Sequence, residues 1–99
     1  MIIRDKDKNI LLQILNDSDL PSLSVWAYGS RVNGLAHECS DLDLVIRTAD
    51  LKPLDLDIYL ALIEKIRESN IAILVEIRDW ARLPTRFHEQ ILQQYEVLY

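Results

Sequence analysis

Two short motifs that could do chemistry lie ten residues apart in this chain. Gly29-Ser30 ends one apolar run, and Asp41-Leu42-Asp43 opens the next. Glycine lets the backbone turn tightly and approach a ligand, and the N–H groups and hydroxyl that follow can bind phosphate oxygens. Two carboxylates two residues apart on a strand share a face, where they can converge on a hard cation such as Mg²⁺. The combination predicts a site for a nucleoside triphosphate.

Neighbouring residues extend both halves of this site. Arg31 can pair with a phosphate oxygen, and Gly34 can end a short helix and leave room for the nucleotide. A third carboxylate would complete a two-metal cage, and Glu76 is the candidate because it interrupts a late apolar run. Asp79 follows three residues later, which places it on the opposite face of a strand. We therefore favour Glu76 over Asp79.

The elements that must position these residues follow from hydrophobic spacing and turn residues. The sequence predicts four helices, over residues 5–16, 30–36 and 54–69 and from Pro84 onward, and three strands, over 23–28, 41–47 and 71–78. Asp5 or Asp7 is expected to cap the first helix, and Asn70 is a plausible end for the third. The third strand, apolar on both faces until Glu76, is expected in a central or well-covered position. Residues 94–99 can extend the last helix or add an edge strand.

This alternation predicts an α/β fold, with one domain over residues 1–99. The segment between the first two strands is short for a crossover helix, so those strands are expected to be antiparallel. The expected architecture is a small mixed β-sheet of three to four strands with helices packed mainly on one face.

Composition narrows the class of partner and the compartment. The net charge is −5, with 11 basic and 16 acidic residues, which disfavours direct binding of a nucleic-acid polymer. The sequence contains neither an apolar run of membrane-spanning length nor a secretion signal, so we expect a cytoplasmic protein without membrane contact. One cysteine, Cys39, excludes an internal disulfide or a multi-cysteine zinc site, and we interpret Cys39 and His37 as surface-loop residues.

The two motifs together resemble those of a known family. Gly-Ser, ten residues and Asp-x-Asp, with the fuller stretches Gly29–Gly34 and Ser40–Leu44, are similar to the signature of the minimal nucleotidyltransferases of the polymerase-beta-like superfamily. The resemblance implies that Asp41, Asp43 and Glu76 bind metal and act in catalysis, although many relatives carry aspartate where Glu76 stands. It also implies a nucleotide-binding set of Gly29, Ser30, Arg31, Gly34 and Ser40.

Stand-alone minimal members are similar to antitoxins paired with an all-helical HEPN protein. The resemblance therefore implies transfer of a nucleoside monophosphate, expected to be AMP from ATP with two Mg²⁺ ions, to a hydroxyl on a HEPN-like partner. Two alternatives stay open. One is a catalytically weak antitoxin that neutralises its partner by forming a complex, and the other is transfer to a small molecule.

Overall fold

The computed structural model of the chain describes residues 3–33 and 41–99. Its elements follow one another as α1 (Asp5–Asp17), β1 (Leu23–Tyr28), α2 (Ser30–Asn33), β2 (Leu42–Thr48), α3 (Leu56–Arg67), β3 (Val75–Asp79), the 3₁₀ turn η1 (Trp80–Arg82), α4 (Thr85–Gln93) and β4 (Tyr95–Val97). The predicted order of helices and strands is confirmed, and the tail forms an edge strand. Gly34, His37, Cys39 and Ser40 lie outside the described residues, as does the end of the helix predicted over 30–36.

The four strands form one mixed sheet in the order β3-β2-β1-β4. β1 pairs antiparallel with β2 and with β4, and β2 pairs parallel with β3. The connection between β1 and β2 contains no full crossover helix among the described residues, which favours the antiparallel arrangement, whereas the α3 crossover allows the parallel one. The mixed sheet and the antiparallel first pair are both as predicted.

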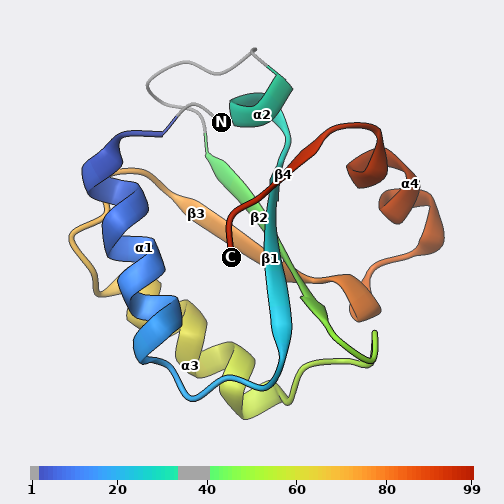
Figure 1. Cartoon of the computed structure of the whole chain (residues 1–99), viewed down its shortest axis with the longest axis horizontal. Helices are drawn as coiled ribbons and strands as arrows, with labels where there is room; N and C mark the ends of the chain where they lie inside the picture. The colour runs from blue at the N-terminus through green and yellow to red at the C-terminus, as the bar shows by residue number, and fades with distance from the viewer. Residues whose placement is uncertain (1–2, 34–40) are drawn as a thin grey trace.

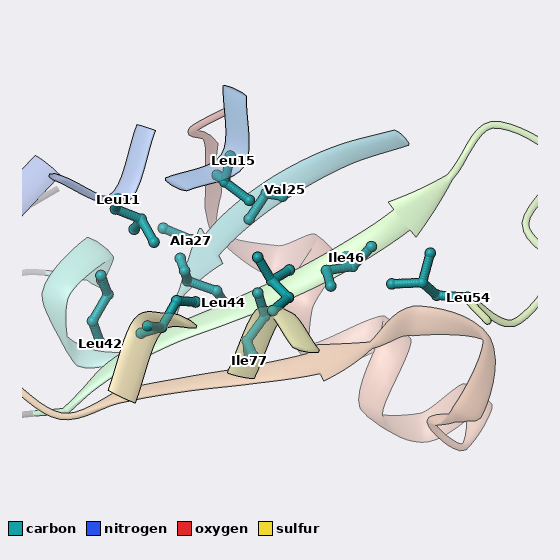
Figure 2. Packing of buried hydrophobic residues seen from close by; sticks show 11 residues of the cluster. Leu11, Leu15, Val25, Ala27, Leu42, Leu44, Ile46, Leu54 and Ile77 are labelled. Carbon is teal, nitrogen blue, oxygen red and sulfur yellow. The ribbon is translucent and has the colours of Figure 1, made fainter. Parts of the chain in front are cut away.

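The main core lies between the sheet and the two long helices. Figure 1 shows α1 and α3 side by side, with α4 apart from both. Alternate strand residues enter this core, among them Val25 and Ala27 of β1 and Leu44 and Ile46 of β2, which Figure 2 shows meeting side chains from α1 and β3. The expected packing of helices mainly on one face is confirmed for α1 and α3.

The opposite face of the sheet carries a smaller aromatic cluster. Trp26 and Val45 point to this face, where they pack with Trp80 of η1 and Ile91 of α4. On α4, Ile91 is buried in this cluster and Phe87 packs against it. This cluster extends along the face to Tyr28, at the end where β1 ends and β2 begins and where the predicted site residues lie.

Two expectations about helix ends are wrong. The N-cap of α1 is Arg4, whose side chain makes no capping bond. Asp7 is instead buried, and its carboxylate accepts hydrogen bonds from Arg4 and from the backbone N–H of Ala72, because a long-range partner competes for it. α3 ends before Asn70, with Glu68 as its C-cap.

Of the two positions expected for the third strand, central or well-covered, the central one is wrong. β3 is an edge strand and begins only at Val75. The apolar residues Ile71 and Ile73 that precede it pack against the main core without joining the sheet. The Tyr59 hydroxyl donates a 2.6 Å hydrogen bond to the carbonyl oxygen of Ile77, so α3 partly protects the edge. In the part of the chain that the structure describes, no helix is long and apolar enough to cross a membrane.

Candidate active site

Strand register brings two of the three predicted carboxylates together. Asp43 of β2 pairs with Glu76 of β3 on one side and with Tyr28 of β1 on the other. Paired residues on neighbouring strands point to the same face, so these three side chains form a row across the sheet. The row lies on the face opposite α1 and α3, at the end of the sheet where β1 ends and β2 begins. Asp43 and Glu76 are therefore neighbours although 33 positions separate them in the sequence.

Asp41 stands next to this row. It precedes the first residue of β2 and is partly exposed. Its negative charge is close enough to contribute to a raised pKa of Asp43. Within the predicted Asp-x-Asp pair, Asp43 is therefore the residue that strand register places beside Glu76.

Gly29 lies against one of these carboxylates, that of Asp43. Its φ angle of +80° is in the left-handed region that favours glycine. A Cβ built at this position would lie 2.5 Å from Oδ2 of Asp43. The bend between β1 and α2 therefore lies directly against the Asp43 carboxylate, and the two sequence motifs meet in space.

The residues after this bend form one helical turn. α2 begins at Ser30, and the N–H of Val32 donates to the carbonyl oxygen of Gly29 over 3.0 Å. Ser30 is partly exposed, so its hydroxyl remains a candidate phosphate donor. Arg31 is only 6% exposed, which leaves little of its side chain accessible to a ligand. The predicted phosphate role of Arg31 therefore has less geometric support than that of Gly29.

Arg78 is part of the site, although the sequence reasoning gave it no role. Its guanidinium lies 3.2 Å from a carboxylate oxygen of Glu76 and 3.7 Å from one of Asp43, and donates a 3.1 Å hydrogen bond to the Tyr28 hydroxyl. The sequence spacing could have identified Arg78, because it follows Glu76 by two residues on the same strand and so shares its face.

Charge and burial shift the pKa values of two groups in this row. Burial raises the pKa of Asp43 above its ordinary value, and the negative charges of Glu76 and Asp41 raise it further, outweighing the opposing effect of Arg78. Burial likewise raises the pKa of the Tyr28 hydroxyl, against the hydrogen bond from Arg78. The site thus holds more negative charge than its own arginine compensates, which is the electrostatic environment that a cation relieves.

The donor chemistry fits Mg²⁺, which prefers carboxylate oxygens. Over residues 3–33 and 41–99, however, no three acidic, histidine or cysteine side chains converge closely enough to hold a metal ion. The guanidinium of Arg78 contacts both Asp43 and Glu76 and stands where a shared cation would be expected. The carboxylates of Asp43 and Glu76 are therefore arranged around a positive group, which in this structure is the guanidinium of Arg78.

A cavity of about 490 Å³ adjoins the bend on the same side of the sheet. Its wall combines two aromatic rings with the amide side chains of α4; the lining residues are Tyr28, Gly29, Phe87, Gln90, Ile91, Gln93 and Gln94. Because the cavity is lined by Tyr28, which belongs to the row, and by Gly29, which lies against Asp43, a small molecule bound there would lie next to Asp43.

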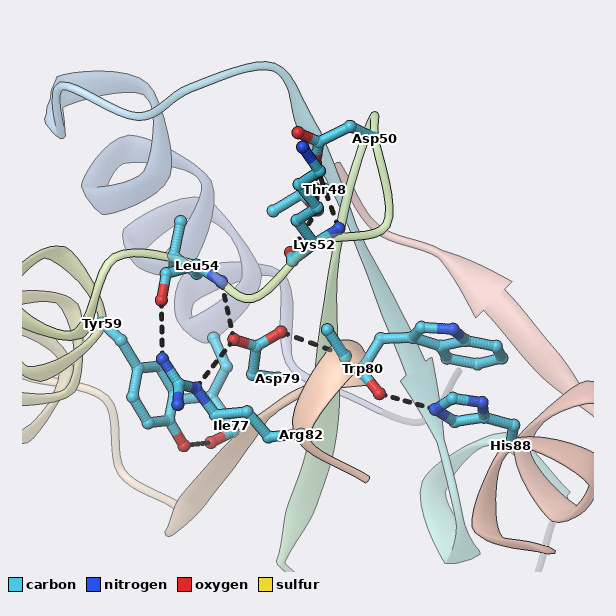
Figure 3. A network of polar contacts seen from close by, with 11 residues as sticks. Thr48, Asp50, Lys52, Leu54, Tyr59, Ile77, Asp79, Trp80, Arg82 and His88 are labelled. Atoms are coloured by element: carbon cyan, nitrogen blue, oxygen red, sulfur yellow. Dashed lines mark hydrogen bonds and ion pairs between the residues drawn. The ribbon is translucent and has the colours of Figure 1, made fainter. Parts of the chain in front are cut away.

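Asp79 has a different role from Glu76, as strand parity predicted. It pairs with Ile46 on the side of the main core and is 3% exposed. Its carboxylate accepts hydrogen bonds from the backbone N–H groups of Leu54 and Ala81 and from Arg82, as Figure 3 shows. Asp79 therefore fixes the turn after β3 to the segment before α3.

Comparisons with known proteins identify the family of this chain. Residues 9–99 match the family model described as "Polymerase beta, Nucleotidyltransferase". A Haemophilus influenzae protein named "Probable protein adenylyltransferase MntA" is 40% identical over 91 residues, which are 92% of this chain and 74% of that protein. A crystal structure of a toxin-antitoxin with AMP-PNP has a TM-score of 0.73 at 26% identity, covering 93% of this chain and 72% of that one.

A tri-AMPylated Shewanella oneidensis HEPN toxin in complex with MNT antitoxin gives a TM-score of 0.70 at 22% identity, covering 98% of this chain and 72% of that chain, a likeness of fold. The family match covers most of the chain, including every residue of the carboxylate row. The chain therefore belongs to the polymerase beta nucleotidyltransferase family and is a nucleotidyltransferase.

Proposed function

We propose that this chain is a Mg²⁺-dependent protein adenylyltransferase that transfers AMP from ATP to a hydroxyl of a HEPN-like partner. The observation that carries the proposal is the register of Asp43 with Glu76 beside the Gly29 bend. The names of the similar proteins support AMP as the transferred group and a HEPN protein as the partner.

In this reaction the acceptor oxygen attacks the α-phosphorus of ATP. A new P–O bond forms, the bond from the α-phosphorus to the bridging oxygen of the β-phosphate breaks, and pyrophosphate leaves. Bound Mg²⁺ would lower the pKa of the acceptor hydroxyl and neutralise charge on the triphosphate. Asp41, Asp43 and Glu76 are the carboxylates that would hold it.

The protein's own side chains supply orientation and a proton acceptor. Gly29 allows the triphosphate to approach the backbone, and the Ser30 hydroxyl can donate to a phosphate oxygen. The Glu76 side chain is 42% exposed, against 24% for Asp43, so Glu76 is the carboxylate better placed to meet an incoming hydroxyl. We assign Glu76 the role of accepting the hydroxyl proton.

The test is labelling of a co-purified HEPN-like partner by ATP carrying a label on its α-phosphate. The wild-type chain should label the partner with Mg²⁺ and not with EDTA. Asp43→Asn should abolish labelling while circular dichroism shows a retained fold. Asp19→Asn, which removes one exposed acid away from the site, is the matched control and should label normally. Undiminished labelling by Asp43→Asn would contradict the proposal.

A second function is favoured by one observation. Arg78 already neutralises part of the charge on Asp43 and Glu76, as in a site that has given up metal binding. In that case the chain would neutralise its partner by forming a complex. A folded Asp41→Asn/Asp43→Asn variant would then still protect cells from the partner, whereas loss of protection would favour the enzyme.

A further inference from the structure

Arg78 contacts every polar side chain of the carboxylate row. Its Nη2 lies 3.2 Å from Glu76, and its Nη1 lies 3.1 Å from the Tyr28 hydroxyl and 3.7 Å from Asp43. The side chain is 38% exposed and passes near the ring of Phe87, at 5.8 Å from the ring centroid. The guanidinium is therefore held at the site but remains accessible to a ligand.

Two cations cannot occupy this position together. A divalent ion bound by Asp43 and Glu76 would use the oxygens that Arg78 now contacts, and its charge would repel the guanidinium. Among the residues that the structure describes, only Asp43 and Glu76 form ion pairs with Arg78. The Tyr28 hydroxyl can accept a hydrogen bond from Arg78 but cannot balance its charge. A guanidinium displaced from these acids needs another anion.

The triphosphate of the proposed substrate is that anion. It would lie against the Gly29 bend, which is within van der Waals reach of Asp43 and therefore of the region that Arg78 occupies. Arginine forms strong charge-assisted hydrogen bonds to phosphate oxygens, often two at a time.

We propose that Arg78 exchanges partners when metal and nucleotide bind. In the free protein it pairs with Asp43 and Glu76, and in the loaded protein it pairs with a phosphate oxygen of ATP. The inference rests on the proposed function, since it needs a triphosphate at the same site. Through this exchange, Arg78 would weaken metal binding as long as no nucleotide is bound.

The exchange predicts opposite effects of one substitution on two binding reactions. Arg78→Met removes the competing cation, so Mn²⁺ without nucleotide should bind about tenfold more tightly. The same variant lacks the phosphate partner, so a non-hydrolysable ATP analogue with saturating Mg²⁺ should bind about tenfold more weakly. A merely structural role for Arg78 would move both affinities in the same direction.

Free Mn²⁺ can be measured by electron paramagnetic resonance, and analogue binding by titration calorimetry. Arg67→Met is the matched control, since it removes one positive charge from an exposed i,i+3 pair with Glu64 on α3 and should change either affinity less than twofold. Arg78→Lys keeps a charge and should fall between wild type and Arg78→Met. Circular dichroism confirms that each variant is folded.

The outcomes separate the inference from the proposed function. If the wild type binds Mn²⁺ and analogue but Arg78→Met binds Mn²⁺ no more tightly, the exchange is wrong and the enzyme proposal stands. Unweakened analogue binding by Arg78→Met also overturns the exchange. If the wild type binds neither ligand, the proposed function fails and the inference fails with it.

Discussion

Gly29 and Asp43 touch so closely that no side chain fits between them. A Cβ on residue 29 would lie 2.5 Å from Oδ2 of Asp43, and the φ angle of +80° is unfavourable for any residue with a Cβ. Gly29→Ala should therefore lower the free energy of unfolding by about 1–2 kcal/mol from the backbone alone, with a further loss from the clash. It should also displace Asp43 and reduce AMP transfer at least about tenfold. Urea unfolding and the labelling assay measure the two effects.

A double-mutant cycle separates the backbone effect from the clash. In an Asp43→Ala background the carboxylate is absent, so Gly29→Ala should cost less by roughly 0.5–1 kcal/mol. An equal cost in both backgrounds would mean that the bend relaxes away from Asp43 without loss. The contact between the two motifs would then be less tight than the structure indicates.

The sequence predicted this contact only in outline. Hydrophobic spacing is local, so it located β1 and β2 and placed Asp43 on the face away from Leu42 and Leu44. It could not reveal that Glu76 pairs with Asp43, because strand register depends on distant packing. The order β3-β2-β1-β4, with β3 at the edge, likewise depends on how α3 crosses the sheet. Of the two positions predicted for the third strand, the central one was wrong, because the apolar residues Ile71 and Ile73 pack against the core without pairing in the sheet.

Repulsion within the row predicts that the protein is more stable without the Asp43 charge. Burial and the charges of Glu76 and Asp41 raise the pKa of Asp43, so its ionised form is disfavoured in the folded state. Asp43→Asn should therefore raise the free energy of unfolding at pH 7 in EDTA by roughly 0.5 kcal/mol, or about 2–4 °C in Tm. Differential scanning calorimetry measures the change.

Asp19→Asn serves again as control for the loss of one negative charge, and should leave Tm unchanged within about 1 °C. A lower Tm for Asp43→Asn would show that the contact with Arg78 outweighs the repulsion. If Asp43→Asn is inactive but more stable, the Asp43 carboxylate supports function and lowers the stability of the fold.

Removing the charge of Asp79 should lower stability, whereas removing the charge of Glu76 should lower activity. Asp79→Asn puts a poorer acceptor at a buried position that receives hydrogen bonds from Leu54, Ala81 and Arg82, so it should lower the free energy of unfolding by about 2–3 kcal/mol. Glu76→Gln, on the exposed side, should change stability by less than about 0.5 kcal/mol and yet abolish AMP transfer. Chemical denaturation and α-phosphate labelling test the pair. If Asp79→Asn were stable but inactive, Asp79 would have a role in the reaction and not the structural role assigned to it.

Arg78 shows why the candidate site was incomplete when read from sequence. Its position two residues after Glu76 identified the face that it shares, but not its contacts with Tyr28 and Asp43. Those contacts depend on the register of β1, β2 and β3, which the sequence pattern does not give. Asp7 shows the same limit, since its position predicted a helix cap, whereas one of its two partners, the N–H of Ala72, is 65 residues away.

Asp7 should make stability depend on acid pH. Burial opposes its ionisation, but hydrogen bonds from Arg4 and from the Ala72 N–H outweigh burial and lower its pKa below the ordinary value of 3.8. Because the folded-state pKa is the lower one, the ionised carboxylate stabilises the fold above about pH 4, and this contribution is lost as the pH falls through the folded-state pKa.

Asp7→Asn should accordingly lower the free energy of unfolding by about 1–2 kcal/mol at pH 7. The difference from wild type should shrink below about pH 4 and vanish once Asp7 is protonated. Asp5→Asn, an exposed acid in the same helical turn, should show no such convergence. Urea titrations between pH 2 and pH 7 measure the effect. The Asp7–Ala72 hydrogen bond also fixes the segment that leads into β3. Asp7→Asn should therefore loosen the position of Glu76 and lower AMP transfer at neutral pH. A fully active Asp7→Asn variant would show that β3 is positioned by the sheet alone.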